Sequence, residues 1–139
     1  MTGSTSIALK LINHLDALTE LEAAINAFCS DHSVEKKQWH RCRLVAEELF
    51  INIITHGYED GQPGSINWTI SFEGNKIHFE IEDNGLAFAP RSPKPKALSL
   101  DEIEDVGGHG TGIIAALVSS IDYSRKDGLN HCHVVMEAG

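Results

Sequence analysis

Apolar residues recur along this chain at two different spacings, and the change from one to the other predicts its elements. Five short stretches are apolar or alternate between apolar and polar residues, as half-buried β-strands do. They cover residues 7–12, 66–72, 77–83, 121–126 and 131–137. Two longer stretches have apolar residues three or four positions apart, which is typical of one face of an α-helix.

The first predicted helix runs from about Leu15 to Ser30, and the second starts after the N-cap Ser33 and runs to about His56. Gly57 is expected to end the second helix in the left-handed conformation. The first helix has an apolar face formed by Leu18, Leu21, Ile25 and Phe28. The second has one formed by Cys42, Val45, Leu49 and Ile53.

Turn signals separate these elements and set their order. Glycine-containing turns are predicted at 60–64, 73–76 and 127–128, and a long loop without periodicity at 86–105 precedes a short helix at 113–120. The order is strand, helix, helix, hairpin, loop, helix, hairpin. It predicts an α+β fold, a two-layer sandwich in which a mixed, mostly antiparallel sheet has its helices on one face.

Length and charge narrow the class of protein. A chain of 139 residues is most simply one domain, residues 1–139. The net charge of −9 argues against a nucleic-acid surface. No apolar run approaches the ~20 residues that span a bilayer, and residues 1–6 do not resemble a secretory signal, so a cytoplasmic protein without membrane contact is expected. The three cysteines lack metal-site spacing and are predicted to be buried apolar side chains.

Glu48 and Asn52 are four residues apart on the second predicted helix, so they share one face of it. An asparagine carbonyl oxygen can bind Mg²⁺, and a glutamate one turn away could accept a proton during phosphoryl transfer. Taken alone, the same spacing is also typical of a solvated helix surface.

Asp83 ends a predicted strand and is followed by Asn84 and Gly85. A carboxylate there can accept a hydrogen bond from an exocyclic amine such as that of adenine, and Gly85 would allow the ring to approach the backbone. A simple turn would have the same sequence. Farther along, the glycines of residues 107–112 expose backbone N–H groups before a helix start, which suits phosphates but also suits a flexible connector.

Three segments, in this order, resemble the motifs of the Bergerat ATPases, the histidine-kinase-like superfamily that includes DNA gyrase, Hsp90 and MutL. Residues 44–58 are similar to the N-box helix, 83–90 to the DxGxxFxP box and 106–113 to the second glycine box. The resemblance covers nearly the whole chain. Within the superfamily the chain looks most like the small bacterial anti-sigma factors. These are serine/threonine-protein kinases that act by partner switching.

The resemblance implies a sandwich that binds ATP and Mg²⁺ between helices and sheet. Asn52 would be the Mg²⁺ ligand and Glu48 the general base toward a serine or threonine hydroxyl. Asp83 would contact adenine, with Gly85 beneath the ring. The lid over the phosphates would be formed by Gly108, Gly110, Thr111 and Gly112.

The resemblance also implies partners: a STAS-type anti-sigma factor antagonist as substrate, a sigma factor or equivalent regulator, and a second copy in a homodimer. The alternative is a non-catalytic nucleotide-binding module that sequesters a protein partner, and the presence of Glu48 favours catalysis. A metal-binding sensor that uses His131 and His133 is a third possibility, although no further ligand stands at metal-site spacing.

Overall fold

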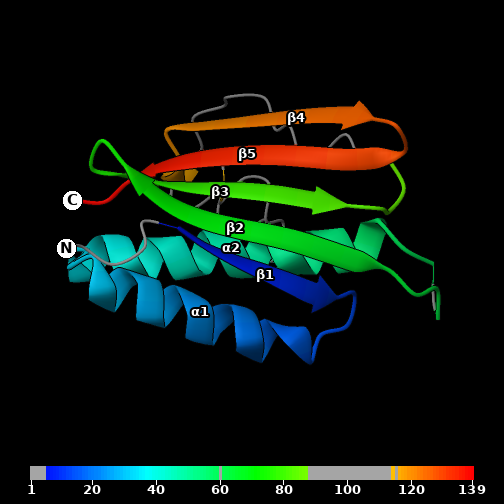
Figure 1. Ribbon diagram of the computed structural model, residues 1–139, viewed down its shortest axis with the longest axis horizontal. Helices are drawn as coiled ribbons and strands as arrows, with labels where there is room; N and C mark the ends of the chain where they lie inside the picture. Colours follow the sequence, from blue (N-terminus) through cyan, green and yellow to red (C-terminus); the bar gives the residue numbers. More distant parts are fainter. Residues whose placement is uncertain (1–5, 60, 88–113, 115) are drawn as a thin grey trace.

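The computed structural model describes residues 6–59, 61–87, 114 and 116–139, in which two long helices pack on one face of a five-stranded sheet (Figure 1). The strands are β1 (Ser6–Ile12), β2 (Ser65–Glu73), β3 (Lys76–Asp83), β4 (Ser120–Lys126) and β5 (Leu129–Glu137). The helices are α1 (Ala17–Asp31) and α2 (Lys36–His56). The predicted α+β class and two-layer arrangement are confirmed.

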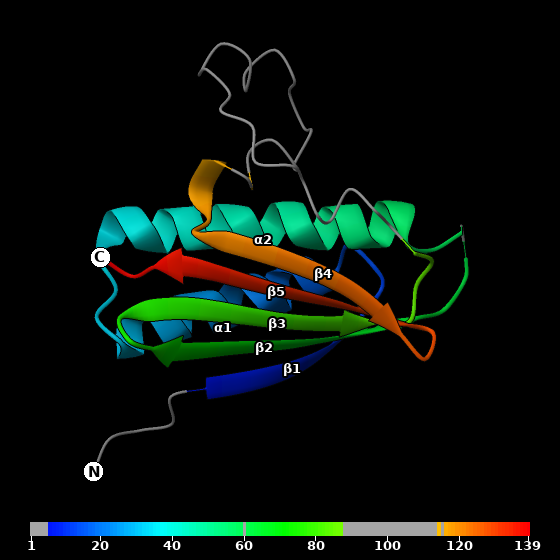
Figure 2. The same ribbon diagram turned by 90° about the horizontal axis from the view of Figure 1, so that it is seen from above.

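The sheet has the strand order β1-β2-β3-β5-β4, and each neighbouring pair of described strands is antiparallel. The described part of the sheet is therefore fully antiparallel rather than mixed. Figure 2 shows from above how the strands twist across the sheet, as right-handed strand twist requires. β3 lies in the centre, so its last residue, Asp83, lies between Ile66 of β2 and Asn130 of β5.

Two tight hairpins fix the register of the sheet. Gly74 and Asn75 both have a φ of 60°, and Asp127 and Gly128 have φ values of 55° and 77°. Positive φ at both central residues is the type I′ geometry that matches strand twist. The glycine, asparagine and aspartate in these turns tolerate it better than other residues.

The core lies between the sheet and the helices, and the inward-facing residues of the strands form its sheet side. Trp68 and Phe79 are fully buried and meet edge to face with ring centroids 5.3 Å apart. The predicted faces of both helices are buried, except that Leu18 is only half-buried. All three cysteines are buried and free, as predicted, and the thiols of Cys29 in α1 and Cys42 in α2 are hydrogen-bonded to each other.

The predicted helix ends differ from the observed ones. Ser33 is not the N-cap of α2, because it has a left-handed φ of 52° and closes the turn after α1 through its N–H to the Ser30 carbonyl. The N-cap is Glu35, with no side-chain cap bond. Gly57 does end α2, but with φ −86°, in the right-handed region. α1 starts at Ala17, since Leu15 lies in the exposed turn before it.

Most of the predicted loop 86–105 and the start of the predicted helix 113–120 lie outside the described residues. Ile114, Ala116 and Leu117 are helical, and this helix ends before β4 begins at Ser120. Among the described helices, none is both long enough and apolar enough to cross a membrane.

One contact between α1 and α2 involves two acidic side chains. Glu47 of α2 is hydrogen-bonded to Glu22 of α1 and forms an ion pair with Arg43, at 3.7 Å between Oε2 and Nε. Partial burial, followed by the interaction with Glu22, raises the pKa of Glu47 to about 7 from 4.5. Glu47 therefore keeps its proton at pH values where exposed glutamates are ionised.

This pair should make the stability of the fold depend on pH. The folded protein binds the Glu47 proton more tightly than the unfolded chain does, so its contribution is complete below pH 4.5 and is lost as pH rises through about 7. Relative to Glu47→Gln, the wild-type free energy of unfolding should fall across that window, measured by urea unfolding at several pH values. Parallel curves for the two proteins would contradict this, and Glu20→Gln, in the first turn of α1, serves as the control.

Candidate functional site

The candidate site is centred on the two buried polar residues of the described chain, Asp83 and Asn130. They face each other at the ends of β3 and β5, and Asn130 Nδ2 donates to Asp83 Oδ1 at 3.0 Å. The same oxygen accepts a bond of 2.9 Å from the Gly85 N–H. Two donors on one oxygen hold the carboxylate in one orientation.

Asn130 also holds the turn that follows Asp83. Its Nδ2 reaches the carbonyl oxygens of Gly85 at 3.2 Å and Leu86 at 2.9 Å. Its Oδ1 accepts from the Tyr123 hydroxyl at 2.6 Å and from Arg125 Nη1 at 2.8 Å. Arg125 Nη1 donates in addition to the Gly85 carbonyl, at 3.0 Å.

Asn130, Tyr123 and Arg125 were not predicted from the sequence, although the pattern of β5 contains a signal for Asn130. The buried residues of β5 alternate from Asn130 through Cys132, Val134 and Met136. An amide in the inward phase of a strand needs buried hydrogen-bond partners. That requirement could have identified Asn130 as part of a site. Tyr123 and Arg125 give no comparable signal, because they lie in a strand with many polar positions.

The turn after Asp83 is joined directly to the end of α2. The Leu86 N–H donates to the Gly57 carbonyl at 2.7 Å. A Cβ at position 85 would lie 2.6 Å from that same oxygen, so only glycine fits there without movement. The close approach at Gly85 was expected to serve a bound ring, but the neighbour that requires the glycine is the backbone of Gly57.

Tyr58, the residue after Gly57, adds a second link. Its hydroxyl donates to Asn84 Oδ1 at 2.7 Å, and the same Asn84 oxygen accepts a bond of 3.2 Å from the Ser65 N–H at the start of β2. The C-terminal end of α2, the turn after β3 and the start of β2 therefore form one hydrogen-bonded unit, which we call the Asp83 junction: residues 57–58, 65 and 83–86, with Asn130.

Glu48 and Asn52 lie on α2, which ends in this junction. From the helical rise, Asn52 is ~7.5 Å along the axis from Gly57, and Glu48 is one turn farther. Both side chains are half-buried. Consecutive helical residues point about 100° apart, so Glu47 faces α1 while Glu48 points elsewhere. Burial alone raises the pKa of Glu48.

The side chains of Glu48, Asn52 and Asp83 are chemically suited to bind a nucleotide with Mg²⁺. Amide and carboxylate oxygens are the ligands that Mg²⁺ prefers, and Glu48 and Asn52 offer both on one helix face. Asp83 is a buried acceptor fixed by two donors. The other predicted lid and phosphate residues, Gly108, Gly110, Thr111 and Gly112, lie outside the described residues.

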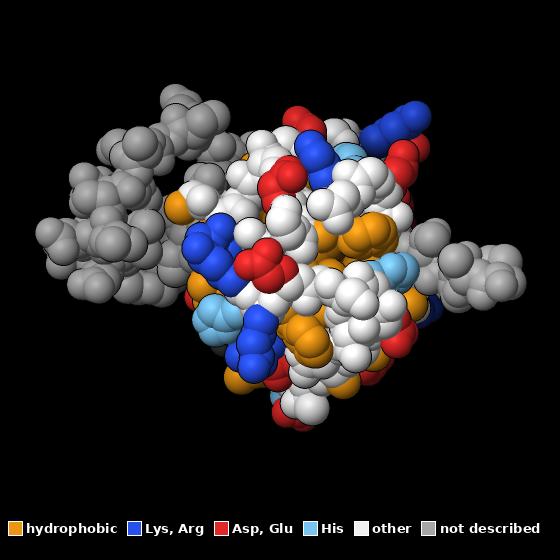
Figure 3. All heavy atoms as spheres, turned by 90° about the vertical axis from the view of Figure 1, so that its left-hand side faces the viewer, with side chains coloured by type: hydrophobic (Ala, Val, Ile, Leu, Met, Phe, Trp, Pro, Cys, Tyr) orange, Lys and Arg blue, Asp and Glu red, His pale blue; other side chains and the backbone are white. Residues whose placement is uncertain are grey.

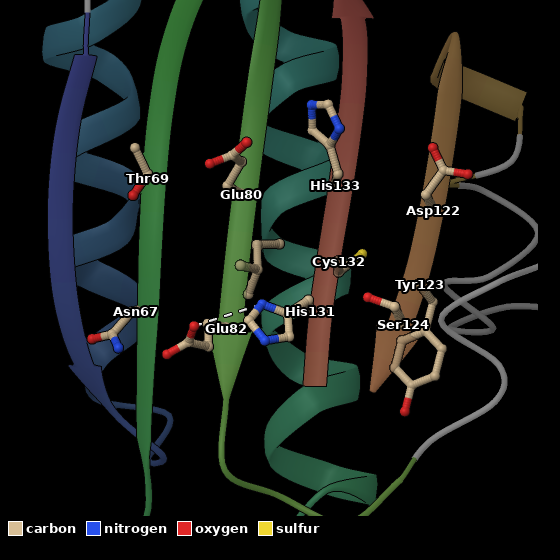
Figure 4. A pocket seen from close by; sticks show the side chains of 11 residues that line it. Asn67, Thr69, Glu80, Glu82, Asp122, Tyr123, Ser124, His131, Cys132 and His133 are labelled. Carbon is tan, nitrogen blue, oxygen red and sulfur yellow. Dashed lines mark ion pairs between the residues drawn. The ribbon is translucent and has the colours of Figure 1, made fainter. Parts of the chain in front are cut away.

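His131 and His133 lie elsewhere, on the face of the sheet opposite the helices (Figure 4). They line a depression of about 430 Å³ together with Glu80, Glu82 and Asp122, among others. His131 Nδ1 lies 3.6 Å from Glu82 Oε2, and His133 Nε2 lies 3.0 Å from Nδ1 of His78 on β3. Among the described residues, no three histidine, cysteine, aspartate or glutamate side chains lie close enough together to hold a metal ion.

Comparison with known proteins identifies the family of the domain. Residues 12–136 match the family described as the histidine kinase-like ATPase domain. The serine/threonine-protein kinase BtrW of Bordetella bronchiseptica is 36% identical over 91 residues, which make up 63% of this chain and 63% of BtrW. The matched part therefore spans less than two thirds of that relative.

Two solved structures share the fold. The RsbU and RsbW domains of Rv1364c from Mycobacterium tuberculosis superpose with a TM-score of 0.65 and 14% identity, over 96% of this chain and 32% of that one. The histidine kinase domain of the Erythrobacter litoralis blue-light activated histidine kinase gives a TM-score of 0.53 and 14% identity, over 88% and 60%. At these identities the likeness concerns the fold.

The contact between Gly85 and Gly57 should make position 85 intolerant of any side chain. Gly85→Ala should lower the free energy of unfolding by about 1–3 kcal/mol, the usual cost of overpacking. Gly61→Ala is the control, because an added Cβ there meets nothing within 4 Å and only its φ of 77° is strained, which costs roughly 1–2 kcal/mol.

Urea unfolding measures the loss in each variant, and because the two expected losses overlap, amide exchange at Leu86 distinguishes the variants. Only Gly85→Ala should speed exchange of the Leu86 N–H, because that N–H is bonded to the displaced Gly57 carbonyl. Unchanged protection of Leu86 in Gly85→Ala would refute the proposed contact.

Proposed function

This chain belongs to the histidine kinase-like ATPase domain family, and from that premise we propose that it is an ATP-dependent serine/threonine-protein kinase of the partner-switching, anti-sigma type. In this proposal residues 1–139 form one ATP-binding domain. The name of BtrW, a serine/threonine-protein kinase, supports the reaction type. The RsbW domain in the Mycobacterium tuberculosis structure has the same fold.

The observation that carries the proposal is the Asp83 junction. A carboxylate that is 1% exposed and held by two donors is a fixed acceptor, which can select the exocyclic amine of adenine. The junction is bonded to the end of the helix that contains Asn52 and Glu48. Base recognition and phosphate chemistry would therefore be positioned by one rigid unit.

In the proposed mechanism each residue has one task. Mg²⁺, held by the amide oxygen of Asn52, would neutralise charge on the phosphates. Glu48 would accept the proton of the attacking serine or threonine hydroxyl. Its pKa, raised by burial, makes it a better proton acceptor than an exposed glutamate. Backbone N–H groups of Gly108, Gly110, Thr111 and Gly112 would hold the phosphates.

The proposed substrate is a STAS-type anti-sigma factor antagonist, and the other proposed partner is a sigma factor or an equivalent regulator. A homodimer in the cytoplasm is proposed as well. These assignments follow from the resemblance of the motifs to partner-switching kinases and agree with the RsbW domain among the structures of the same fold.

Glu48→Gln should slow phosphoryl transfer by about 10²–10⁴-fold, the usual effect of losing a general base, with ATP affinity unchanged. The measurement is transfer from γ-labelled ATP to a STAS-domain protein encoded beside this one. Glu47→Gln is a closely matched control, since it removes the neighbouring glutamate, which faces Glu22. Equal losses in the two variants would rule out a specific role for Glu48.

Asn52→Ala should abolish transfer and remove the part of ATP affinity that depends on Mg²⁺. Calorimetric titration with ATP, with Mg²⁺ and with a chelator, separates that part from direct nucleotide contacts. Asn67→Ala, on the open face of the sheet, should leave both titrations unchanged. If Asn52→Ala retains the full effect of Mg²⁺, the ligand is another residue. If the wild type binds ATP but transfers nothing, the protein is a nucleotide-dependent binding module.

A further inference from the structure

The first two turns of α2 carry a concentration of positive charge that is unusual for this chain. The net charge is −9, yet residues 36–43 contain four of the eleven lysines and arginines, one histidine and no acidic residue. In the described structure no ion pair involves Lys36, Lys37 or Arg41. The positive end of the helix dipole lies at the same place.

Beside this segment lies a hollow of about 420 Å³ between α1 and α2, which we call the Trp39 groove. It is lined by Asn26 of α1 and by Lys36, Trp39, His40 and Arg43 of α2. These four α2 residues follow the i, i+3, i+4, i+7 spacing of one helix face. Figure 3 looks at the end of the molecule where α2 begins and shows lysine or arginine side chains close to histidine there.

Trp39 forms a fixed apolar wall in this groove. Its indole packs partly against the core, and Nε1 donates to Asn26 Oδ1 at 2.9 Å. None of the residues that line the groove is acidic. Glu35 precedes α2, and Glu47, which contacts Glu22, pairs with Arg43 at the other end. The groove thus combines an aromatic surface with cations along its rim, which is the chemistry that binds an acidic segment with an apolar anchor.

We propose that the Trp39 groove docks an acidic amphipathic segment of a protein partner, with one apolar side chain against Trp39 and carboxylates toward Lys36, Lys37 and Arg43. Two adjacent helices with a groove between them commonly accept a third helix in this way. The groove residues are distinct from the Asp83 junction, so the proposal does not depend on the kinase reaction.

The short range of electrostatic interactions in salt favours a short acidic segment over a nucleic acid as the ligand of the groove. At physiological ionic strength exposed charges act over about 8 Å, so a short segment experiences mainly the local cations. A nucleic acid extends beyond the patch and meets the acidic remainder of a chain with net charge −9.

The test uses the protein's own tryptophans. Trp68 is fully buried in the core, so a fluorescence change on binding reports Trp39. The probe is a peptide of about four helical turns with a leucine stripe flanked by glutamates, and the comparison peptide has lysine at each glutamate. At low salt the acidic peptide should give a saturable change in fluorescence, and the basic peptide none.

Lys36→Glu/Lys37→Glu should weaken binding of the acidic peptide at least tenfold. Acidic residues near a helix N-terminus are favourable, so this variant should fold. Lys10→Glu/Lys126→Glu changes the net charge equally in the first and fourth strands and should retain affinity within about threefold. Trp39→Phe, followed with a labelled peptide, should bind more weakly than wild type.

Four outcomes would overturn the proposal: no saturable change with the acidic peptide, equal losses in the two charge variants, tighter binding of a short RNA than of the peptide, or a dimer in sedimentation that Lys36→Glu/Lys37→Glu dissociates. The last outcome would make the occupant a second copy of this chain.

Discussion

The hydrogen bond between Asn130 and Asp83 is the constraint on which the site depends. Both side chains are buried, and a buried polar group that loses its partner costs about 1–3 kcal/mol. The bond is satisfied only when β3 and β5 keep their register, with residues 83 and 130 opposite each other. The Asn130 amide also binds the carbonyl groups of residues 85 and 86, so the register of the sheet fixes the position of this turn. The turn itself is hydrogen-bonded to Gly57 at the end of α2, which fixes the position of that helix end.

Helix α2 has three chemically different faces. One face, with Val45, Leu49 and Ile53, is buried in the core. A second contains Glu48 and Asn52, whose half-burial gives the glutamate its raised pKa. A third, with Trp39 and Arg43, lines the groove beside α1. The 3.6-residue period allows one helix to anchor the fold and present two different chemistries.

Sequence patterns predicted the strands, both long helices and the α+β class, because the spacing of apolar residues follows the period of each element. Helix ends were less accurate: Ser33 closes a local turn after α1, and Gly57 accepts a hydrogen bond from Leu86, a contact that only the folded chain makes. Glu48, Asn52 and Asp83 were predicted as site residues from motifs, and their roles remain a prediction. Asn130 was missed because its partner lies 47 residues earlier in the chain, and only the strand order β3-β5 brings them together.

The position of Asn130 has a consequence for how such sequences are read. A gene copy could keep every recognisable ATP-site motif and still decay through one codon in the last strand, where Asn130 lies outside those motifs. Under the proposed kinase function, an inventory of intact motifs would count such a copy as competent. In this chain, residue 130 is therefore a position where one substitution would disturb the Asp83 junction although every motif remains.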